Sequence, residues 1–390
     1  MKIGIDKIGF ASSQYVLKME ALAEARQVEL AKYQKGLMID AISISPITED
    51  IVTLAATACQ EILTNQDKQE IDLVILATET AIDQSKAASV YIHGLLDIQP
   101  FARAIEMKEA CYATTAALDY ANAHIAMHPD ASVLVIASDI AKYGIASGGE
   151  PTQGVGSIAM LVKKNPRILT FNNDNIAQTR DIMDFWRPNY SATPFVNGRF
   201  STEQYLDTLT TTWTQYQKKT HKNVSDFAAF CFHIPFPKQA LKGMKLLMDQ
   251  TVSEAKQIAL EKAFTDSISF SRQVGNIYTG SLYMSFLSLL ENNKELKAGD
   301  DIAFFSYGSG AVCEIFSGQL VDGYHEMLTI DHQAMLDARR NITVEEYEAL
   351  FYEEARFDDK GNVTLPTYLT GDYRLDSIQE HQRIYQKNDR

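Results

Sequence analysis

The sequence contains little cysteine, glycine or proline. Its 390 residues include 4 cysteines, 20 glycines and 10 prolines. So few cysteines in so long a chain do not make a disulfide framework, and none of them stands in a Cys-x-x-Cys pair. The low glycine and proline content excludes a collagen-like or low-complexity protein. The chain is long enough for two or three globular units.

Long hydrophobic runs are also missing. No stretch approaches the roughly 18 continuous apolar residues of a membrane span. The N-terminal segment MKIGIDKIGF lacks the apolar core and cleavage site of a signal peptide. We therefore expect a soluble protein of a reducing, cytoplasmic compartment, with no membrane partner.

Positive charge is in deficit, with 36 Lys and Arg against 50 Asp and Glu and a net charge of −14. Nucleic acid is not an expected partner, because its binding needs a basic surface. An anionic ligand would need a local cluster of positive charge, and Lys238, Lys242 and Lys245 supply one at helical spacing. A solvated charged face is the alternative interpretation of these lysines. No HExxH motif or other paired His or Cys indicates a metal site.

Short apolar runs alternate with helical patterns, which predicts an α/β fold. The strands fall into two sets of five. The predicted strands are Lys2–Phe10, Asp72–Ala77, Ala102–Met107, Val133–Ala137 and Ser157–Val162, followed by Ile168–Phe171, Phe227–His233, Ser267–Phe270, Ile302–Ser306 and Ala311–Phe316.

The two sets contain the same parts in the same order, so we infer an internal duplication. Glu79 and His233 end corresponding strands, and Cys111 and Asn276 open corresponding helices. The halves span 1–165 and 166–390, and the second carries an aromatic insertion (172–220) and a C-terminal tail.

The two corresponding helices, Cys111–Met127 and Tyr278–Leu290, have small or apolar residues nearly all round. A helix without a polar face is usually buried. Both would be buried in a five-layer αβαβα sandwich, between two sheets that outer helices cover. Two ordinary doubly wound domains are the alternative.

Cys111 is the candidate nucleophile. It follows a predicted strand and opens a helix, whose dipole favours the thiolate form. A buried core cysteine is the alternative. The duplication favours the nucleophile, because it brings Glu79, His233 and Asn276 to the same ends of neighbouring strands, where α/β sheets bind ligands.

Glu79 and His233 are the candidate acid–base groups. Glu79 ends the apolar strand IDLVILATET, where partial desolvation would raise its pKa toward that of a useful base. An exposed strand-end carboxylate is the alternative. His233 ends the strand FAAFCFHI, and alone it would more often be a buried core histidine.

Seven short blocks, in order over nearly the whole chain, carry a resemblance to a known family. They are ATET at Glu79, EACYATTAAL at Cys111, SDIAKY, PTQGVGSIAML, FHIPFPKQALK at His233, GNIYTGSLY at Asn276 and FFSYGSGA. The chain resembles the thiolase superfamily and, within it, the bacterial 3-hydroxy-3-methylglutaryl-CoA synthase family. The resemblance implies a thiolase-like sandwich, a homodimer and a place in the mevalonate pathway of isoprenoid synthesis.

The resemblance also implies the chemistry. Cys111 takes the acetyl group of acetyl-CoA, and Glu79 removes a proton from its methyl group. The resulting carbanion attacks the ketone of acetoacetyl-CoA, while His233 polarises that ketone and protonates the alkoxide. Water then releases 3-hydroxy-3-methylglutaryl-CoA. The CoA thioesters are substrates, and no cofactor is expected.

Further residues acquire roles from the family pattern. The residues expected to bind substrate are Tyr143, Thr152, Ser201, Lys238, Lys242, Asn276 and Ser309. Backbone amides at Cys111 and near Ser309 would form an oxyanion hole. The sequence has SGGE before PTQG, where many relatives carry a ligand-contacting Asn, so Gly148 acquires no role.

Two other functions remain in competition. A ketoacyl synthase of the type that initiates fatty-acid synthesis shares the Cys, His and Asn arrangement but does not need Glu79 as a base, and the blocks ATET and FHIPFPK argue against it. A non-catalytic acyl-CoA-binding protein on the same fold is the other. A biosynthetic thiolase is disfavoured, because Cys313 lacks the glycine expected after a second catalytic cysteine.

Overall fold

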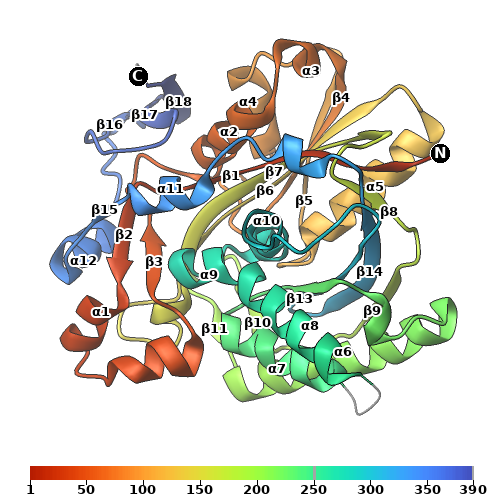
Figure 1. Ribbon diagram of the computed structural model, residues 1–390. Helices are drawn as coiled ribbons and strands as arrows, with labels where there is room; N and C mark the ends of the chain where they lie inside the picture. Colours follow the sequence, from red (N-terminus) through yellow and green to blue (C-terminus); the bar gives the residue numbers. More distant parts are fainter. Residues whose placement is uncertain (249–251, 389–390) are drawn as a thin grey trace.

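The computed structural model describes residues 1–248 and 252–388, in which helices and strands alternate along most of the chain (Figure 1). Ten strands form one large mixed sheet. The first-half strands are β1 (Ile3–Ser12), β4 (Ile71–Ala77), β5 (Arg103–Met107), β6 (Ser132–Ala141) and β7 (Gly154–Lys164). They lie in the order β5-β4-β6-β7-β1. The strand β4 is parallel to β5 and β6, whereas β7 is antiparallel to both of its neighbours.

The second-half strands follow the same pattern. They are β8 (Leu169–Phe171), β9 (Ile176–Thr179), β12 (Ala229–Phe232), β13 (Asp301–Gly308) and β14 (Val312–Leu320). The order is β12-β13-β14-β8, with β12 parallel to β13 and β14 antiparallel to β13 and β8. The strands β8 and β1 also pair, which joins the two halves into one continuous sheet.

One predicted strand is wrong. The segment Ser267–Phe270 is helical: α8 (Glu254–Ser267) ends there and α9 (Ser269–Val274) begins. Phe270 and Val274, four residues apart, both pack into the central core. That is the spacing of one helix face, which a short apolar run does not distinguish from a strand. The second half therefore has no counterpart to β5 among the described residues.

Helices separate and cover the two halves of the sheet. Alternate residues of the strands point to opposite faces, so that Ile75 packs toward α5 (Ala113–Met127) and α10 (Ser281–Asn292), whereas Val74 packs toward α2 (Ile51–Ile62). Figure 1 shows α10 in the middle of the molecule. The five-layer αβαβα sandwich is thus confirmed, with its two sheets continuous through β1 and β8.

The two central helices differ in their burial. Every residue of α10 from Ser281 to Leu290 is buried, as its composition predicts. The C-terminal part of α5 reaches the surface, where Tyr120 is 46% and Met127 is 78% exposed. The expectation that the whole of this helix is buried was therefore wrong.

The remaining elements surround this core. A capping box of Thr343 and Glu346 begins α12 (Val344–Tyr352). The other helices are α1 (Met19–Ala25), α3 (Asn65–Glu70), α4 (Ala88–Leu95), α6 (Gly198–Thr220), α7 (Pro237–Leu247) and α11 (His332–Asp337), with a π-helix, η1 (Lys32–Leu37), and the 3-10 turns η2 (Glu150–Thr152), η3 (Val224–Asp226), η4 (Tyr278–Gly280) and η5 (Tyr324–Met327). The smaller strands are β2 (Tyr15–Lys18), β3 (Ala41–Ile44), β10 (Phe185–Trp186), β11 (Phe195–Val196), β15 (Arg340–Asn341), β16 (Val363–Thr364), β17 (Tyr373–Gln379) and β18 (Gln382–Lys387).

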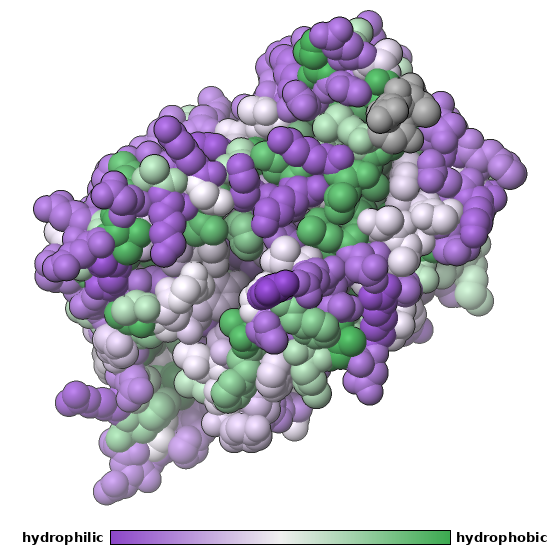
Figure 2. All heavy atoms as spheres, turned by 90° about the horizontal axis from the view of Figure 1, so that it is seen from below, coloured by the Kyte–Doolittle hydropathy of each residue, from purple (hydrophilic) through white to green (hydrophobic). Residues whose placement is uncertain are grey.

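Hydrophilic residues cover most of the face shown in Figure 2, and hydrophobic residues gather in patches between them. Within residues 1–248 and 252–388, no helix combines the length and the apolar character needed to cross a membrane.

Candidate active site

The thiol of Cys111 and the carboxylate of Glu79 meet at the carboxyl ends of two neighbouring parallel strands. Glu79 lies two residues after β4, and Cys111 lies between β5 and α5. The Cys111 Sγ donates a hydrogen bond to Glu79 Oε2 at 3.2 Å. Both residues are half-buried. The preceding Ala110 has a φ of 43°, an uncommon backbone conformation for a residue with a side chain.

Electrostatics favour the protonated forms of this pair. Desolvation and the negative charge of Asp139 raise the pKa of Glu79 to about 8. Desolvation and the nearby Glu79 raise the pKa of the Cys111 thiol well above its usual value. The expectation that the helix dipole favours a thiolate is therefore not met in the free site, because α5 begins only at Ala113 and burial beside a carboxylate outweighs the dipole.

Asp139 holds the loops of the two halves together, a role that the sequence analysis missed. This fully buried carboxylate accepts hydrogen bonds from the Glu79 backbone N–H at 2.9 Å and from the Thr78 hydroxyl at 2.8 Å. Its other oxygen accepts from the Thr279 hydroxyl at 2.5 Å and from the Thr279 N–H at 3.1 Å. A carboxylate on the apolar strand β6 was the signal that could have identified it.

His233 follows β12 and is 3% exposed. The backbone N–H of His233 donates to the Phe305 carbonyl at 2.8 Å, which continues the pairing of β12 with β13. Its Nδ1 has no hydrogen-bond partner among the described residues. Burial lowers the pKa of the ring to about 3, so the imidazole is neutral at physiological pH. The neutral ring can donate a hydrogen bond to a substrate or accept one from it.

Asn276 and Tyr143 come from different halves and contact each other. Asn276 Nδ2 donates to the Tyr143 hydroxyl oxygen at 3.0 Å, and the Asn276 N–H donates to the Thr152 carbonyl at 2.9 Å. Burial raises the pKa of the Tyr143 hydroxyl, and the electrostatic interactions with Cys111 and Glu79 act in the same direction. The predicted residues Tyr143, Thr152 and Asn276 therefore lie together, beside the thiol and the carboxylate.

The turn that contains Ser309 packs against the backbone at Cys111. A Cβ on Gly308 would lie 2.7 Å from the Tyr112 N atom, so only glycine fits there. The buried Asp184 fixes this turn by accepting from the Gly310 N–H at 2.9 Å. Ser201, predicted to bind substrate, donates to Asp184 at 3.4 Å. The role of Asp184 was not predicted, because it lies in the irregular insertion.

The same insertion supplies a cation to the site. Arg187 Nη2 donates to the Glu79 carbonyl at 2.7 Å, and its charge opposes the rise in the pKa of Glu79. This exposed arginine was also missed. The predicted lysines lie on α7, the helix that follows His233, where Lys238 is half-buried and Lys242 is exposed. Neither lysine forms an ion pair among the described residues.

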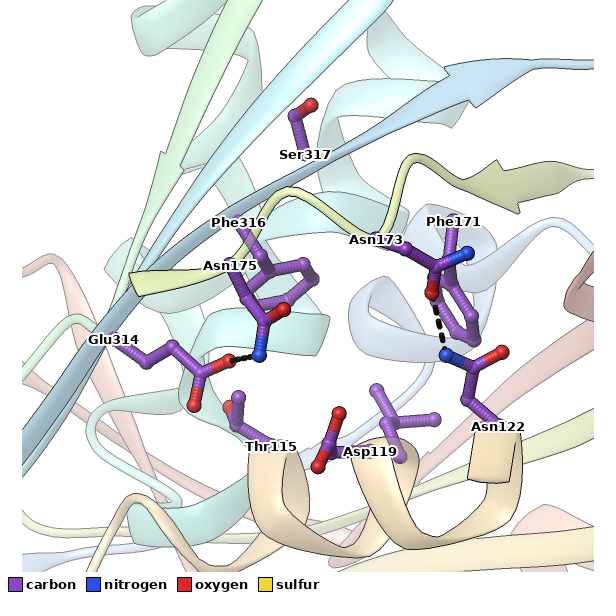
Figure 3. Close-up of a pocket in the computed structure, with 10 residues that line it drawn as sticks. Thr115, Asp119, Asn122, Phe171, Asn173, Asn175, Glu314, Phe316 and Ser317 are labelled. Atoms are coloured by element: carbon purple, nitrogen blue, oxygen red, sulfur yellow. Dashed lines mark hydrogen bonds between the residues drawn. The ribbon is translucent and has the colours of Figure 1, made fainter. Parts of the chain in front are cut away.

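A separate small cavity lies beside α5 and is shown in Figure 3. Its volume is about 40 Å³, which is room for a water molecule or two rather than for an acyl-CoA. The side chains of Asn175 and Glu314 close one end through a 2.9 Å hydrogen bond. Its lining residues are Thr115, Leu118, Asp119, Asn122, Phe171, Asn173, Asn175, Glu314, Phe316 and Ser317, a set without Glu79, Cys111 or His233.

Family comparisons cover nearly the whole chain. The model of the hydroxymethylglutaryl-coenzyme A synthase N-terminal domain matches residues 2–166. The model of the corresponding C-terminal domain matches residues 176–265 and 245–388.

Individual relatives agree with these matches. The hydroxymethylglutaryl-CoA synthase of Enterococcus faecalis is 50% identical over 99% of this chain and 100% of its own length. A polyketide biosynthesis 3-hydroxy-3-methylglutaryl-ACP synthase of Bacillus subtilis is 32% identical over 88% of this chain and 86% of its own. A crystal structure described as HMG-CoA synthase complexed with CoA superimposes with a TM-score of 0.98 at 61% identity, covering 100% of both chains. A structure described as MvaS in complex with 3-hydroxy-3-methylglutaryl coenzyme A gives 0.89 at 31% identity, covering 100% of this chain and 99% of that one.

Proposed function

The chain belongs to the hydroxymethylglutaryl-CoA synthase family, and from this premise we propose how its own residues carry out the reaction. The enzyme condenses acetyl-CoA with acetoacetyl-CoA and water to give 3-hydroxy-3-methylglutaryl-CoA and CoA. The observation that carries the proposal is the 3.2 Å contact between Cys111 Sγ and Glu79 Oε2. The contact supports the proposal, because the nucleophile and the base of this reaction must both reach one acyl group.

Acetyl transfer to Cys111 is the first step. The thiol loses its proton to Glu79, and the sulfur attacks the thioester carbonyl of acetyl-CoA. The carbon–sulfur bond to CoA breaks, and the leaving CoA thiolate takes up a proton. Backbone amides at Cys111 and in the turn at Ser309 donate to the carbonyl oxygen as it becomes negative. The raised pKa of Glu79 suits this exchange, because the carboxyl can both accept and return a proton near neutral pH.

Condensation is the second step. The Glu79 carboxylate removes a proton from the acetyl methyl, and the carbanion forms a carbon–carbon bond to the ketone carbon of acetoacetyl-CoA. The neutral ring of His233 donates a hydrogen bond to the ketone oxygen. As the alkoxide forms, the ring passes its proton to the oxygen and is reprotonated by the proton that Glu79 removed from the methyl group. Asn276 and Tyr143 orient the acetoacetyl group. Water then cleaves the Cys111 thioester, and the new carboxylate leaves with one proton released.

Substrate binding is assigned to the residues around this centre. We assign contacts with CoA or its acyl chain to Thr152, Ser201, Lys238 and Lys242, with the lysines facing phosphate. The reaction needs no cofactor in this scheme. We also propose that the enzyme acts in the cytoplasm, in the mevalonate pathway.

The enzyme is proposed to act as a homodimer. The strand β5 forms one edge of the large sheet, and edge strands are natural sites of pairing with another chain. Sedimentation at micromolar concentration tests this, and a monomer at that concentration would contradict it.

The activity itself is tested by following the enolate absorbance of acetoacetyl-CoA. We expect that absorbance to fall only when acetyl-CoA is also present. Acetoacetyl-CoA and acetoacetyl carrier protein are compared as acceptors, because one relative is named as an ACP synthase. No loss of absorbance with either acceptor would contradict the proposed function.

A further inference from the structure

A buried carboxylate outside the reaction centre is linked to residues near both ends of the chain. Glu150 is 1% exposed. Arg26, directly after α1, forms a fork with it: Nε lies 3.0 Å from one carboxylate oxygen and Nη2 lies 2.8 Å from the other. The same arginine pairs with Glu348 of α12 at 2.7 Å. Figure 1 shows α1 and α12 close together on one side of the molecule.

Glu150 begins the turn η2, which reaches the active site within two residues. Thr152, the last residue of η2, accepts the hydrogen bond from the Asn276 backbone at 2.9 Å. The following residue, Gln153, donates to the Tyr347 hydroxyl at 2.5 Å, and that hydroxyl donates to Glu150 at 3.3 Å. The turn is therefore attached to α12 through two side chains.

The turn η2 is the C-terminal part of the loop 143–153, and the N-terminal end of that loop is held by the same hydrogen-bond network. The Tyr143 N–H donates to Gln153 Oε1 at 3.4 Å, and the Tyr143 hydroxyl accepts from Asn276 Nδ2 at 3.0 Å. Asn276 is thus held from its backbone and from its side chain by the loop 143–153, and Glu150 is the buried ionic attachment of that loop.

We propose that Arg26, Glu150, Tyr347 and Glu348, here called the terminal clamp, position Asn276 and Tyr143 for the condensation step. Glu150 is a positioning residue, because it acts through η2 and not on the reacting atoms. This inference rests on the proposed function of the site. The hydrogen bonds that fix Cys111 and Glu79 come from Asp139, Arg187 and each other, so loss of the clamp lowers the rate of condensation far more than the maximal rate of acetyl transfer.

The primary test is Glu150→Gln, which keeps the size of the side chain and removes its charge. We expect acetyl transfer to Cys111, measured as CoA released without acceptor at saturating acetyl-CoA, to stay within about twofold of the unmodified enzyme. We expect kcat/KM for acetoacetyl-CoA to fall about tenfold to 100-fold, the size of loss that a small misplacement of a substrate-orienting group produces. An equal loss in both steps, or no loss in condensation, would overturn the proposal.

Two further variants guard against a folding artefact. Tyr347→Phe keeps the ion pair and removes only the hydroxyl between Gln153 and Glu150, so condensation falls by a smaller factor while acetyl transfer is unchanged. Asp130→Asn removes a 96% exposed carboxylate that pairs with Lys164, and both steps should stay unchanged. A normal condensation rate in Tyr347→Phe would contradict the linkage through this hydroxyl.

Coupling within the clamp is tested by a double variant. If Arg26 and Glu150 act as one unit, the double variant Arg26→Met, Glu150→Gln should condense no more slowly than Glu150→Gln alone. If the fold-losses of the two single variants multiply in the double variant, the two residues act independently and the proposal of one unit is refuted.

A readout independent of activity separates this proposal from the proposed function. Hydrogen exchange of amides in 143–153 should be faster in Glu150→Gln than in the unmodified protein, whether or not condensation is observed. Unchanged exchange would refute the clamp, whereas an unmodified protein that does not condense would refute only the proposed function.

Discussion

The pKa of Glu79 predicts how the condensation rate depends on pH. The base acts only as a carboxylate, and with a pKa of about 8 its ionised fraction is about 1% at pH 6, about 10% at pH 7 and about half at pH 8. The rate of the condensation step should therefore rise about tenfold from pH 6 to pH 7 and about fivefold from pH 7 to pH 8. It should level off above pH 9.

The assay must isolate the step in which Glu79 acts. Enzyme already acetylated by acetyl-CoA is mixed rapidly with acetoacetyl-CoA, and product is measured in a single turnover. The Cys111 thiol is then blocked by the acetyl group and does not titrate. His233, with a pKa lowered to about 3, stays neutral over this range. The pH dependence that remains belongs to Glu79. Acetylation removes the Cys111 hydrogen bond that lowers the Glu79 pKa, so the midpoint does not fall below that of the free site.

The matched control is Glu79→Gln, which keeps the shape of the side chain and cannot accept the proton. We expect this variant still to take up acetyl from acetyl-CoA, although more slowly because the Cys111 proton has lost its acceptor, to condense about 100-fold more slowly or worse, and to show no rise with pH. A flat profile in the unmodified enzyme between pH 6 and pH 9, or the same rise in Glu79→Gln, would refute the assignment of the base.

Three further outcomes are expected. Lys242→Ala should weaken the binding of CoA esters more at low salt than at high salt, because phosphate attraction is screened, and titration calorimetry at two ionic strengths measures this. Asp139→Asn should move the midpoint of the Glu79 pH dependence to lower pH, because it removes a negative charge; an unmoved midpoint would contradict that cause. Gly275→Ala should lower the free energy of unfolding by about 2 kcal/mol or more, because its φ is 87° and its Cβ would lie 2.0 Å from a carbonyl oxygen; the control Gly148→Ala, in open space, should be near neutral in denaturant unfolding.

The layered core was predictable from the sequence, because apolar periodicity and strand order are local signals. The buried helix α10 shows this most clearly, since its composition alone indicates the central layer. The segment Ser267–Phe270 was not predictable, because four residues do not separate a strand from a helix end. The exposed end of α5 was missed for a similar reason: small residues are compatible with either environment.

The proximity of Glu79 and Cys111 was predictable, because both follow neighbouring strands at the same edge of the sheet. Glu79 and Cys111 do lie in contact, as expected. The supporting carboxylates Asp139 and Asp184 were not found, because their role is to bind backbone N–H groups of loops distant in the sequence. The protonation of Cys111 was also misjudged, since desolvation depends on the packed site and not on the helix that follows it.

Acetylation of Cys111 is the most direct test of the account. The protein is mixed with acetyl-CoA alone, and its intact mass is measured after rapid quenching, followed by peptide mapping. We predict one acetyl group, carried by the peptide that contains Cys111, and no adduct in Cys111→Ala. An unmodified mass, or an acetyl group on another residue, would contradict the covalent mechanism.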